Sequence, residues 1–205
     1  MKVIGIVGSP RENGNTEFFT KTALDELNKT GIETELISLI GKNISQCTGC
    51  YKCIEAKRCV IRDDFDEIFQ KMHEADGIIL ASPAYHSCVT PPLKAVMDRA
   101  GFSGRWAANN MKEKGQSYCW DNNGFFSGKV GAGITVARRA GHCFAYSQLL
   151  MWLTANDFTV IGSNYWNVGM AGTGGAHDAA DDAEGIGIMQ HMAKNMAHVL
   201  EKLNQ

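Results

Sequence analysis

The chain has 205 residues, 44% of them hydrophobic and 20% charged, a composition that is typical of one globular α/β domain and argues against a disordered chain. Its 20 basic and 22 acidic side chains leave a net charge of −2, which excludes the strong positive field that attracts nucleic acid or anionic membranes. The apolar start is too short for a signal peptide and no membrane-length apolar run follows, so we expect a soluble cytoplasmic protein.

Short apolar runs alternate along the chain with helix-length amphipathic segments, a pattern typical of a parallel sheet with helices on both faces. In chain order it predicts a strand at 2–7, a helix at 16–28, a strand at 33–39, a helix at 65–75, a strand at 77–82, a helix from 91, a strand at 130–136, a helix at 144–155, a strand at 158–163 and a helix at 181–203. We therefore expect a single domain over residues 1–205, with long inserted segments at 40–62 and 101–128.

The loop between the first strand and the first helix is dense in groups that bind anions. It reads Gly8-Ser9-Pro10-Arg11-Glu12-Asn13-Gly14-Asn15-Thr16. Hydroxyl and amide groups are offered by Ser9, Asn13, Asn15 and Thr16, the helix N-terminus adds a favourable dipole, and Arg11 can complete the charge balance. The loop has neither the dinucleotide G-x-G-x-x-G spacing nor the Walker spacing of NTPases. It predicts a monophosphate site, and the alternative is an ordinary helix N-cap with a glycine-rich turn.

Four of the seven cysteines stand within thirteen residues, as Cys47, Cys50, Cys53 and Cys59. In a reducing compartment an odd number of cysteines argues against a disulfide framework. The spacing C-x2-C-x2-C-x5-C suits sulfurs around one small centre, although it lacks the x3 spacing and the proline of the bacterial ferredoxin run. We favour an iron–sulfur cluster, with a structural zinc site or a metal-free remnant as alternatives.

The other long segment, residues 101–128, is rich in aromatic side chains. They are Trp106, Tyr118, Trp120, Phe125 and Phe126. One interpretation is a lid or a subunit contact, and the other is a solvated insertion packed by its own aromatics. Three isolated cysteines, Cys88, Cys119 and Cys143, are interpreted as small apolar residues or incidental thiols.

Three loops, each directly after a predicted strand, carry a family resemblance. The 8–16 loop resembles the FMN phosphate loop of the NADPH-dependent FMN reductase and iron–sulfur flavoprotein families. The second flavin loop of these families, with the helix after it, is similar to Ser82-Pro83-Ala84-Tyr85-His86 and residues 91–99 of this chain. The third flavin loop of these families is similar to Ala137-Arg138-Arg139-Ala140-Gly141-His142. The four-cysteine segment, continued by residues 60–65, is similar to the compact cysteine motif of the iron–sulfur flavoproteins. The resemblance covers most of the chain except residues 101–128.

The resemblance implies a flavodoxin-like, three-layer α/β/α fold with a five-stranded parallel sheet in the order 2-1-3-4-5. It places FMN at the carboxyl ends of strands one, three and four, where the three loops lie. Within that site we expect the segment from Pro83 through Ala84 and Tyr85 to His86 to wall the flavin ring and meet its edge. The third loop, from Ala137 to His142 with Gly141, would complete the site.

Positive charge near the flavin is expected from Arg138 or Arg139, and the alternative is that both arginines lie on a solvated loop. Proton transfer could be tuned by His86 and His142, although loop histidines are more often polar walls. Because hydride chemistry belongs to flavin N5, we expect no catalytic acid, base or nucleophile from the protein.

We therefore expect an FMN-dependent oxidoreductase that takes electrons from NAD(P)H or a ferredoxin-like donor and passes them to a small acceptor such as a flavin or quinone. A [4Fe-4S] cluster beside the flavin would carry single electrons. The alternatives are an electron carrier or redox sensor that serves a protein partner, and a metal-binding scaffold without flavin. The family's dimers and tetramers, the aromatic insertion and the glycine-rich loop at 169–175 predict a homodimer or homotetramer.

Overall fold

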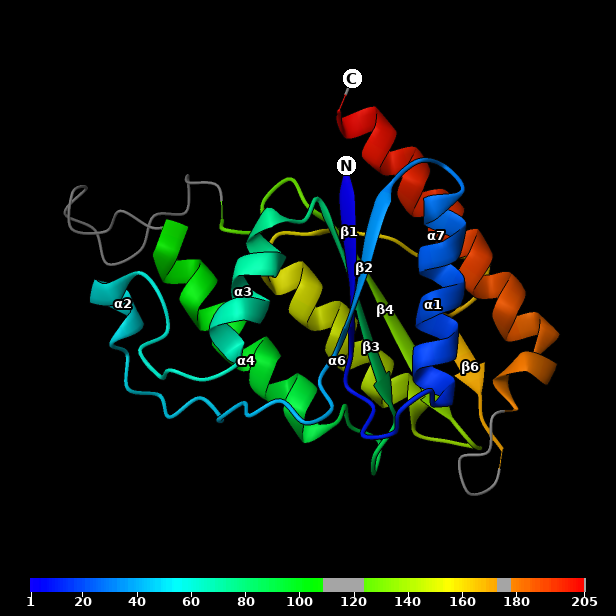
Figure 1. Ribbon diagram of the computed structural model, residues 1–205, viewed down its shortest axis with the longest axis horizontal. Coiled ribbons are helices and arrows are strands. Elements are labelled where there is room, and N and C mark those ends of the chain that lie inside the picture. The colour runs from blue at the N-terminus through cyan, green and yellow to red at the C-terminus, as the bar shows by residue number, and fades with distance from the viewer. Residues whose placement is uncertain (109–123, 173–177, 205) are drawn as a thin grey trace.

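The computed structural model describes residues 1–108, 124–172 and 178–204. At its centre lies a parallel sheet (Figure 1). Its strands are β1 (Lys2–Val7), β2 (Glu33–Ser38), β3 (Gly77–Pro83), β4 (Val130–Ala137), β5 (Thr159–Val160) and β6 (Val168–Met170). The order is β2-β1-β3-β4-β5, with β6 also paired to β4, and every pairing is parallel. The predicted strand order is confirmed.

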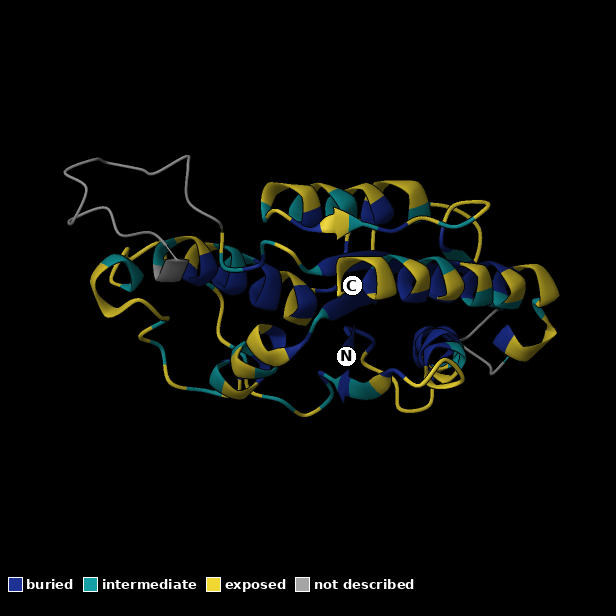
Figure 2. Ribbon diagram, turned by 90° about the horizontal axis from the view of Figure 1, so that it is seen from above, coloured by how far each residue is buried: buried dark blue, intermediate teal, exposed yellow. Residues whose placement is uncertain are grey.

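Helices cover the sheet on both faces. They are α1 (Asn15–Asn28), α3 (Phe65–Glu74), α4 (Pro91–Ala108), α6 (His142–Ala155) and α7 (Ala183–Leu203), with a short α2 (Cys53–Ala56) in the cysteine segment. One core cluster packs α1 and α7 against the sheet, and a second packs α3, α4 and α6 against the other face. Figure 2 shows buried residues on the inner sides of the helices and exposed residues on their outer sides.

The central strands are buried on both faces, which is why they read as continuous apolar runs rather than as alternating ones. All eight residues of β4 are buried, as are five of the six residues of β1. Neighbouring side chains of β1 point to opposite faces: Val3 belongs to the core beneath α1 and α7, and Ile4 to the core beneath α3 and α4. The two predicted layers of helices are therefore both required to keep this sheet from water.

The fifth strand differs from its prediction, which placed it at 158–163. Only β5 pairs with the start of β4, at Val130 and Gly131, whereas β6 pairs with the end of β4, from Thr135 to Ala137. Residues 162–166 leave the sheet edge between them, and they include the exposed Tyr165 and Trp166. The prediction missed β6 because three residues around one glycine give no readable period.

The described part of the 101–128 segment joins the main core. Its first residues, 101–108, are the last turns of α4. Phe126 is buried and its ring stacks on Phe158 at 5.0 Å, while Phe125 stacks on Phe69 at 4.7 Å. These two rings therefore pack against the domain rather than only against each other. Tyr118 and Trp120 lie outside the described residues.

The remaining predicted helices lie within a few residues of their expected bounds, and residues 179–181 form a short 3-10 turn before α7. Among the helices described here, none combines the length and the apolar character that crossing a bilayer requires.

Candidate functional site

The phosphate loop is held in place at both of its ends. Where β1 ends, the Gly8 N–H donates to the Ala81 carbonyl at 2.8 Å, and its own carbonyl accepts a hydrogen bond of 2.7 Å from the Thr90 hydroxyl. Within the loop, the Arg11 N–H donates to Ser9 Oγ at 3.2 Å, and the Asn13 N–H to the Glu17 carboxylate at 3.1 Å. The loop is thus braced by β3, by the start of α4 and by the first turn of α1.

A cavity of about 740 Å³, counted with its open mouth, lies at the carboxyl ends of β1, β3 and β4. Without the open solvent at its mouth the cavity measures about 250 Å³, and it opens at the strand ends, where open parallel sheets bind their ligands. The cavity is lined by Ser9, Arg11, Gly14, Asn15, Thr16, Pro83, Ala84, Tyr85, Val136, Ala137, Arg138, Ala171 and Gly172. Three loops that are far apart in the sequence thus meet at one site.

Nine of the fourteen predicted flavin-site residues line this cavity: Ser9, Arg11, Asn15, Thr16, Pro83, Ala84, Tyr85, Ala137 and Arg138. The other five, Asn13, His86, Arg139, Gly141 and His142, are absent from its described lining. Asn13 turns its N–H toward Glu17, and Arg139 is exposed. Gly141 and His142 start α6, where His142 Nδ1 is buried without a hydrogen-bond partner in the described part of the chain.

A tight turn forms the rim of the cavity after β3. Tyr85 and Cys88 exchange both backbone hydrogen bonds, at 2.8 and 2.9 Å, and the two residues between them have positive φ angles, +47° at His86 and +65° at Ser87. This is the pattern of a type I′ turn, which glycine and asparagine adopt most easily. The third loop packs on this turn, because a Cβ on Gly141 would lie 3.1 Å from Ser87 Oγ.

The chemistry of the lining fits a phosphate ester that carries a polyol chain. Both charged residues in the described lining are arginines, Arg11 and Arg138, and Ser9 and Thr16 add hydroxyls. The amide of Asn15 donates from Nδ2 to Asp178 at 2.7 Å, whereas its buried Oδ1 has no partner among the described residues. An unpartnered buried acceptor fits the hydroxyls of a ribityl chain, and Arg11, on the same loop as Ser9 and Thr16, fits the phosphate.

The four clustered cysteines line a second cavity. Cys47, Cys50, Cys53 and Cys59 share it with other residues of the cysteine segment and with Arg99, Phe102 and Ser103 of α4. All four thiols are free. Within residues 1–108, 124–172 and 178–204, no three Cys, His, Asp or Glu side chains stand close enough to hold a single metal ion. Four free thiols around one cavity are the donor set that an iron–sulfur cluster requires.

Two of these thiols have shifted pKa values. Hydrogen bonds from the Lys52 backbone N–H and then from the Thr48 hydroxyl lower the pKa of Cys50. Burial raises the pKa of Cys53. The thiolate is the form that binds metal, so Cys50 is the more readily available ligand of the two.

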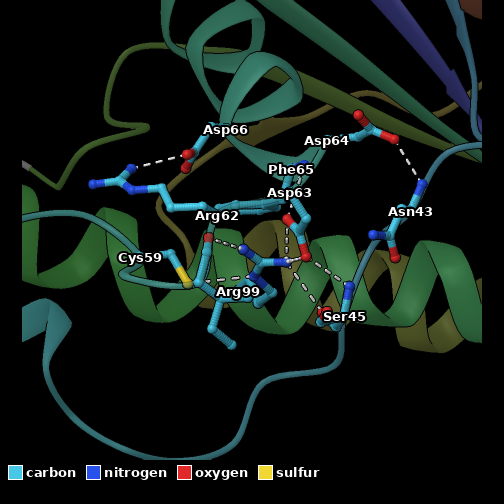
Figure 3. Close-up of polar contacts among 10 residues, drawn as sticks. Asn43, Ser45, Cys59, Arg62, Asp63, Asp64, Phe65, Asp66 and Arg99 are labelled. Carbon is cyan, nitrogen blue, oxygen red and sulfur yellow. Dashed lines mark hydrogen bonds and ion pairs between the residues drawn. The ribbon is translucent and has the colours of Figure 1, made fainter.

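Arg99 of α4 anchors the cysteine segment (Figure 3). Its side chain is fully buried and forms an ion pair with Asp63 at 2.7 Å, while its guanidinium lies 4.1 Å from the centre of the Phe65 ring. Although burial acts to raise the pKa of Asp63, hydrogen bonds from the Ser45 N–H and from Arg99 hold it below its usual value. Sequence reasoning missed this role, since nothing in the pattern around Arg99 marks a partner so far away in the chain.

Residues 1–173 match the model of the NADPH-dependent FMN reductase family. The chain belongs to this family. It is 35% identical to an iron–sulfur flavoprotein of Methanocaldococcus jannaschii over 215 residues, with all of both chains covered. Membership makes the protein a flavoprotein with FMN as cofactor and a flavin oxidoreductase or electron carrier as its function.

Solved structures agree on the fold. The chain aligns over its whole length with 80% of RosB, solved with 8-demethyl-8-formylriboflavin-5′-phosphate, at a TM-score of 0.74 and 20% identity. It also aligns over its whole length with all of an archaeal flavodoxin, at a TM-score of 0.57 and 14% identity. The flavodoxin-like fold is therefore confirmed for this member of the FMN reductase family.

The flavin cavity contains residues that the sequence did not indicate. Val136 belongs to β4, and Ala171 with Gly172 follows β6, the strand that the prediction missed. The signal for the last two is the glycine-rich run at 169–175, from which the sequence predicts self-association instead. Residues 173–175 of that run lie outside the described part of the chain.

The two cavities are separate sites within this chain. Their described linings have no residue in common. Figure 1 places α2 beside α4 on one side of the molecule, and β6 with the start of α1 on the other. The fold therefore positions the cysteines through α4, and the flavin cavity through the ends of β1, β3 and β4.

Proposed function

We propose that this member of the FMN reductase family is a cytoplasmic enzyme that transfers electrons from NAD(P)H or a ferredoxin-like donor to a small acceptor such as a flavin or quinone. The observation that carries this proposal is the cavity at the strand ends, with an anion-binding loop on one side and an exposed rim on the other. FMN, once bound, supplies both hydride and single-electron chemistry.

In this proposal, the residues of the chain bind FMN and orient its ring. Ser9, Asn15 and Thr16 hold the phosphate and ribityl chain, and Arg11 neutralises the phosphate charge. Tyr85 is 42% exposed at the rim, so the ring wall that it forms stays open to a second substrate. Arg138 places positive charge at the third loop, where it favours a reduced, anionic flavin.

We further propose that Cys47, Cys50, Cys53 and Cys59 bind a [4Fe-4S] cluster. Support comes from the shared cavity, from the four free thiols and from the Methanocaldococcus jannaschii relative, which is named an iron–sulfur flavoprotein. A cluster at this place would exchange single electrons, so that donors of one electron and of two electrons could both serve the protein.

A carrier function is the second candidate, and one observation favours it. Two aromatic side chains stand exposed beside the cysteine cavity: Tyr51 is 58% and Phe102 39% exposed, with their rings edge to face at 6.1 Å. An apolar patch at a redox centre is a surface that a protein partner could cover. In this alternative, electrons pass to or from a protein and no small molecule turns over.

The first experiment is an anaerobic absorption spectrum of the purified protein with FMN, iron and sulfide analysis. We expect near-stoichiometric FMN and iron. Steady NAD(P)H oxidation with a quinone, flavin or nitro acceptor supports the enzyme, whereas reduction by ferredoxin alone supports the carrier. A protein without flavin contradicts the cavity assignment, and a full load of FMN without iron contradicts the cluster alone.

A matched pair of variants tests the cysteine assignment. Cys50→Ser removes a proposed ligand and should lose iron while it keeps FMN. Cys143→Ser removes an exposed thiol of α6, outside the cysteine segment and the flavin cavity, and should keep both. Equal iron content in the two variants would exclude Cys50 as a ligand.

A further inference from the structure

Arg99 makes more contacts with the cysteine segment than an anchor requires. Its Nη1 donates to both oxygens of Asp63, at 2.7 and 2.8 Å, and to the Ser45 carbonyl at 3.1 Å, while Nη2 donates to the Ile61 carbonyl at 2.9 Å. These bonds already tie the segment to α4. The third nitrogen, Nε, donates to Cys59 Sγ over 3.3 Å (Figure 3).

The strength of the hydrogen bond from Arg99 Nε to Cys59 depends on whether Cys59 is a neutral thiol or an iron-bound thiolate. A neutral thiol is a weak acceptor, whereas a thiolate accepts a charge-assisted hydrogen bond. Arginine keeps its charge at every pH that proteins experience, so the Nε–H is always a cationic donor. A cysteine that ligates iron is a thiolate, and the contact then becomes a strong one.

We propose that Arg99 is the positioning residue of the cysteine site, that it fixes Cys59 and raises the reduction potential of the cluster, and that Asp63 limits this rise. The inference rests on the proposed cluster at Cys47, Cys50, Cys53 and Cys59. Reduction by a one-electron donor, a reduced flavin or a ferredoxin-like protein, would add one electron to the cluster and break no bond, so the cluster and its thiolates would gain one negative charge. A buried cationic N–H at a ligand sulfur stabilises this added charge, and the neighbouring carboxylate opposes it.

Two single variants should shift the potential in opposite directions. Arg99→Lys keeps a cation for Asp63 but removes the Nε–H, so the potential should fall. Asp63→Asn keeps the shape of the side chain but leaves the charge of Arg99 without its counter-charge, so the potential should rise. A tenfold change in the ratio of oxidised to reduced cluster, which is about 59 mV for one electron, is the expected size of each shift.

The potential is measured on the full-length, anaerobically purified protein by a redox titration that is followed by electron paramagnetic resonance. Lys94→Met is the matched control, because Lys94 lies on the exposed side of α4 and pairs with Asp98. It should change neither the iron content nor the potential. A purely structural Arg99 would also leave the potential unchanged in every variant that still holds iron.

Amide hydrogen exchange over residues 45–63 in the iron-free protein gives a readout that does not depend on the cluster. Arg99→Lys should speed exchange in this segment about tenfold, and Lys94→Met should not. A buried pair can be costly to break, so the double variant Arg99→Met with Asp63→Leu replaces it by apolar side chains of similar volume. If Arg99→Lys does not fold, the double variant replaces it as the test of the proposal. The reduction potential of its cluster should lie below that of the wild type.

The outcomes separate this inference from the proposed function. A wild-type protein without iron overturns the cluster and this inference with it. A wild type that holds iron, with one unchanged potential in Arg99→Lys, Asp63→Asn and the double variant, overturns this inference alone. Loss of iron with retention of FMN in Arg99→Lys supports the positioning role.

Discussion

Gly8 links β1 to the phosphate loop at a point where no side chain fits. A Cβ there would lie 2.6 Å from Thr90 Oγ1 and 2.7 Å from Leu93 Cβ, and the first of these atoms already bonds the Gly8 carbonyl. The close approach brings the start of α4 to the strand end. At residue scale, this glycine therefore fixes how near α4 comes to the flavin cavity.

We expect Gly8→Ala to destabilise the protein by about 1 to 3 kcal/mol, since the added methyl must displace packed atoms. It should also weaken FMN binding, because the loop begins at this residue. Urea unfolding and FMN titration measure the two effects. Gly162→Ala is the control, as a Cβ at Gly162 meets nothing within 4 Å. Equal stability of the two variants would contradict the packing argument.

The adjacent arginines of the third loop offer a comparison at single-residue resolution. Both are exposed, but Arg138 lines the flavin cavity and Arg139 is absent from its described lining. We expect Arg138→Gln to weaken FMN binding about threefold to tenfold, or roughly 0.7 to 1.4 kcal/mol. The loss should shrink at high salt because exposed charges are screened.

Arg139→Gln is the natural control, with an expected change of less than twofold by the scale of scattered surface charges. Quenching of FMN fluorescence during titration of the apoprotein measures both. If Arg139→Gln weakens FMN binding as much as Arg138→Gln does, the prediction is wrong. Both arginines of the loop would then contribute to FMN binding through their charge.

At the scale of elements, Glu35 of β2 joins β1 and α3. Its carboxylate lies 2.7 Å from Lys71 Nζ and 2.9 Å from Lys2 Nζ. Hydrogen bonds from Lys71 and then from Lys2 lower the pKa of Glu35 below its reference value of 4.5. A carboxyl with a lowered pKa in the folded state adds stability above its unfolded pKa, and this stability is lost as the pH falls through the folded value.

Glu35→Gln should therefore cost about 0.5 to 1 kcal/mol of unfolding free energy at pH 7, the size typical of a partly exposed network of charges. The difference from the wild type should shrink as the pH falls below 4.5 and vanish once the pH lies below the lowered pKa of Glu35 in the folded protein. Chemical unfolding at several pH values measures it. Glu33→Gln, at a side chain that is 71% exposed, should change the unfolding free energy less than Glu35→Gln does. A difference that is independent of pH would show that packing, not charge, holds β2 to α3.

At the scale of the whole molecule, α6 remains apolar on the side that faces away from the sheet. Ala145, Leu149 and Leu153 are buried, yet Phe144 and Met151, seven residues apart and so on one helix face, are 71% and 70% exposed. Tyr165 and Trp166 add to the exposed apolar surface. We propose that this surface is the contact through which the chain forms a homodimer or homotetramer.

Met151→Glu should shift the assembly toward the monomer in analytical ultracentrifugation, because a buried, unpaired charge is costly at an interface. Leu203→Glu changes an apolar side chain that is 54% exposed on α7 and should leave the assembly intact. A wild-type protein that sediments as a monomer at micromolar concentration would contradict the proposal.

The sequence by itself determined what depends on near neighbours in the chain. The period of apolar residues predicted strands and helices, the loop at 8–16 indicated an anion site, and the spacing of Cys47, Cys50, Cys53 and Cys59 indicated a shared centre. Each signal arises within a few residues, because backbone geometry sets the period and short loops set the distance between donors.

Only the tertiary structure decided what depends on partners that are distant in the chain. Arg99 bonds residues 36 to 54 positions earlier, β6 finds its place on β4, and Arg138 rather than Arg139 lines the cavity. No local period encodes these choices. They follow from which helix face packs against the sheet and from the direction in which each loop side chain then points.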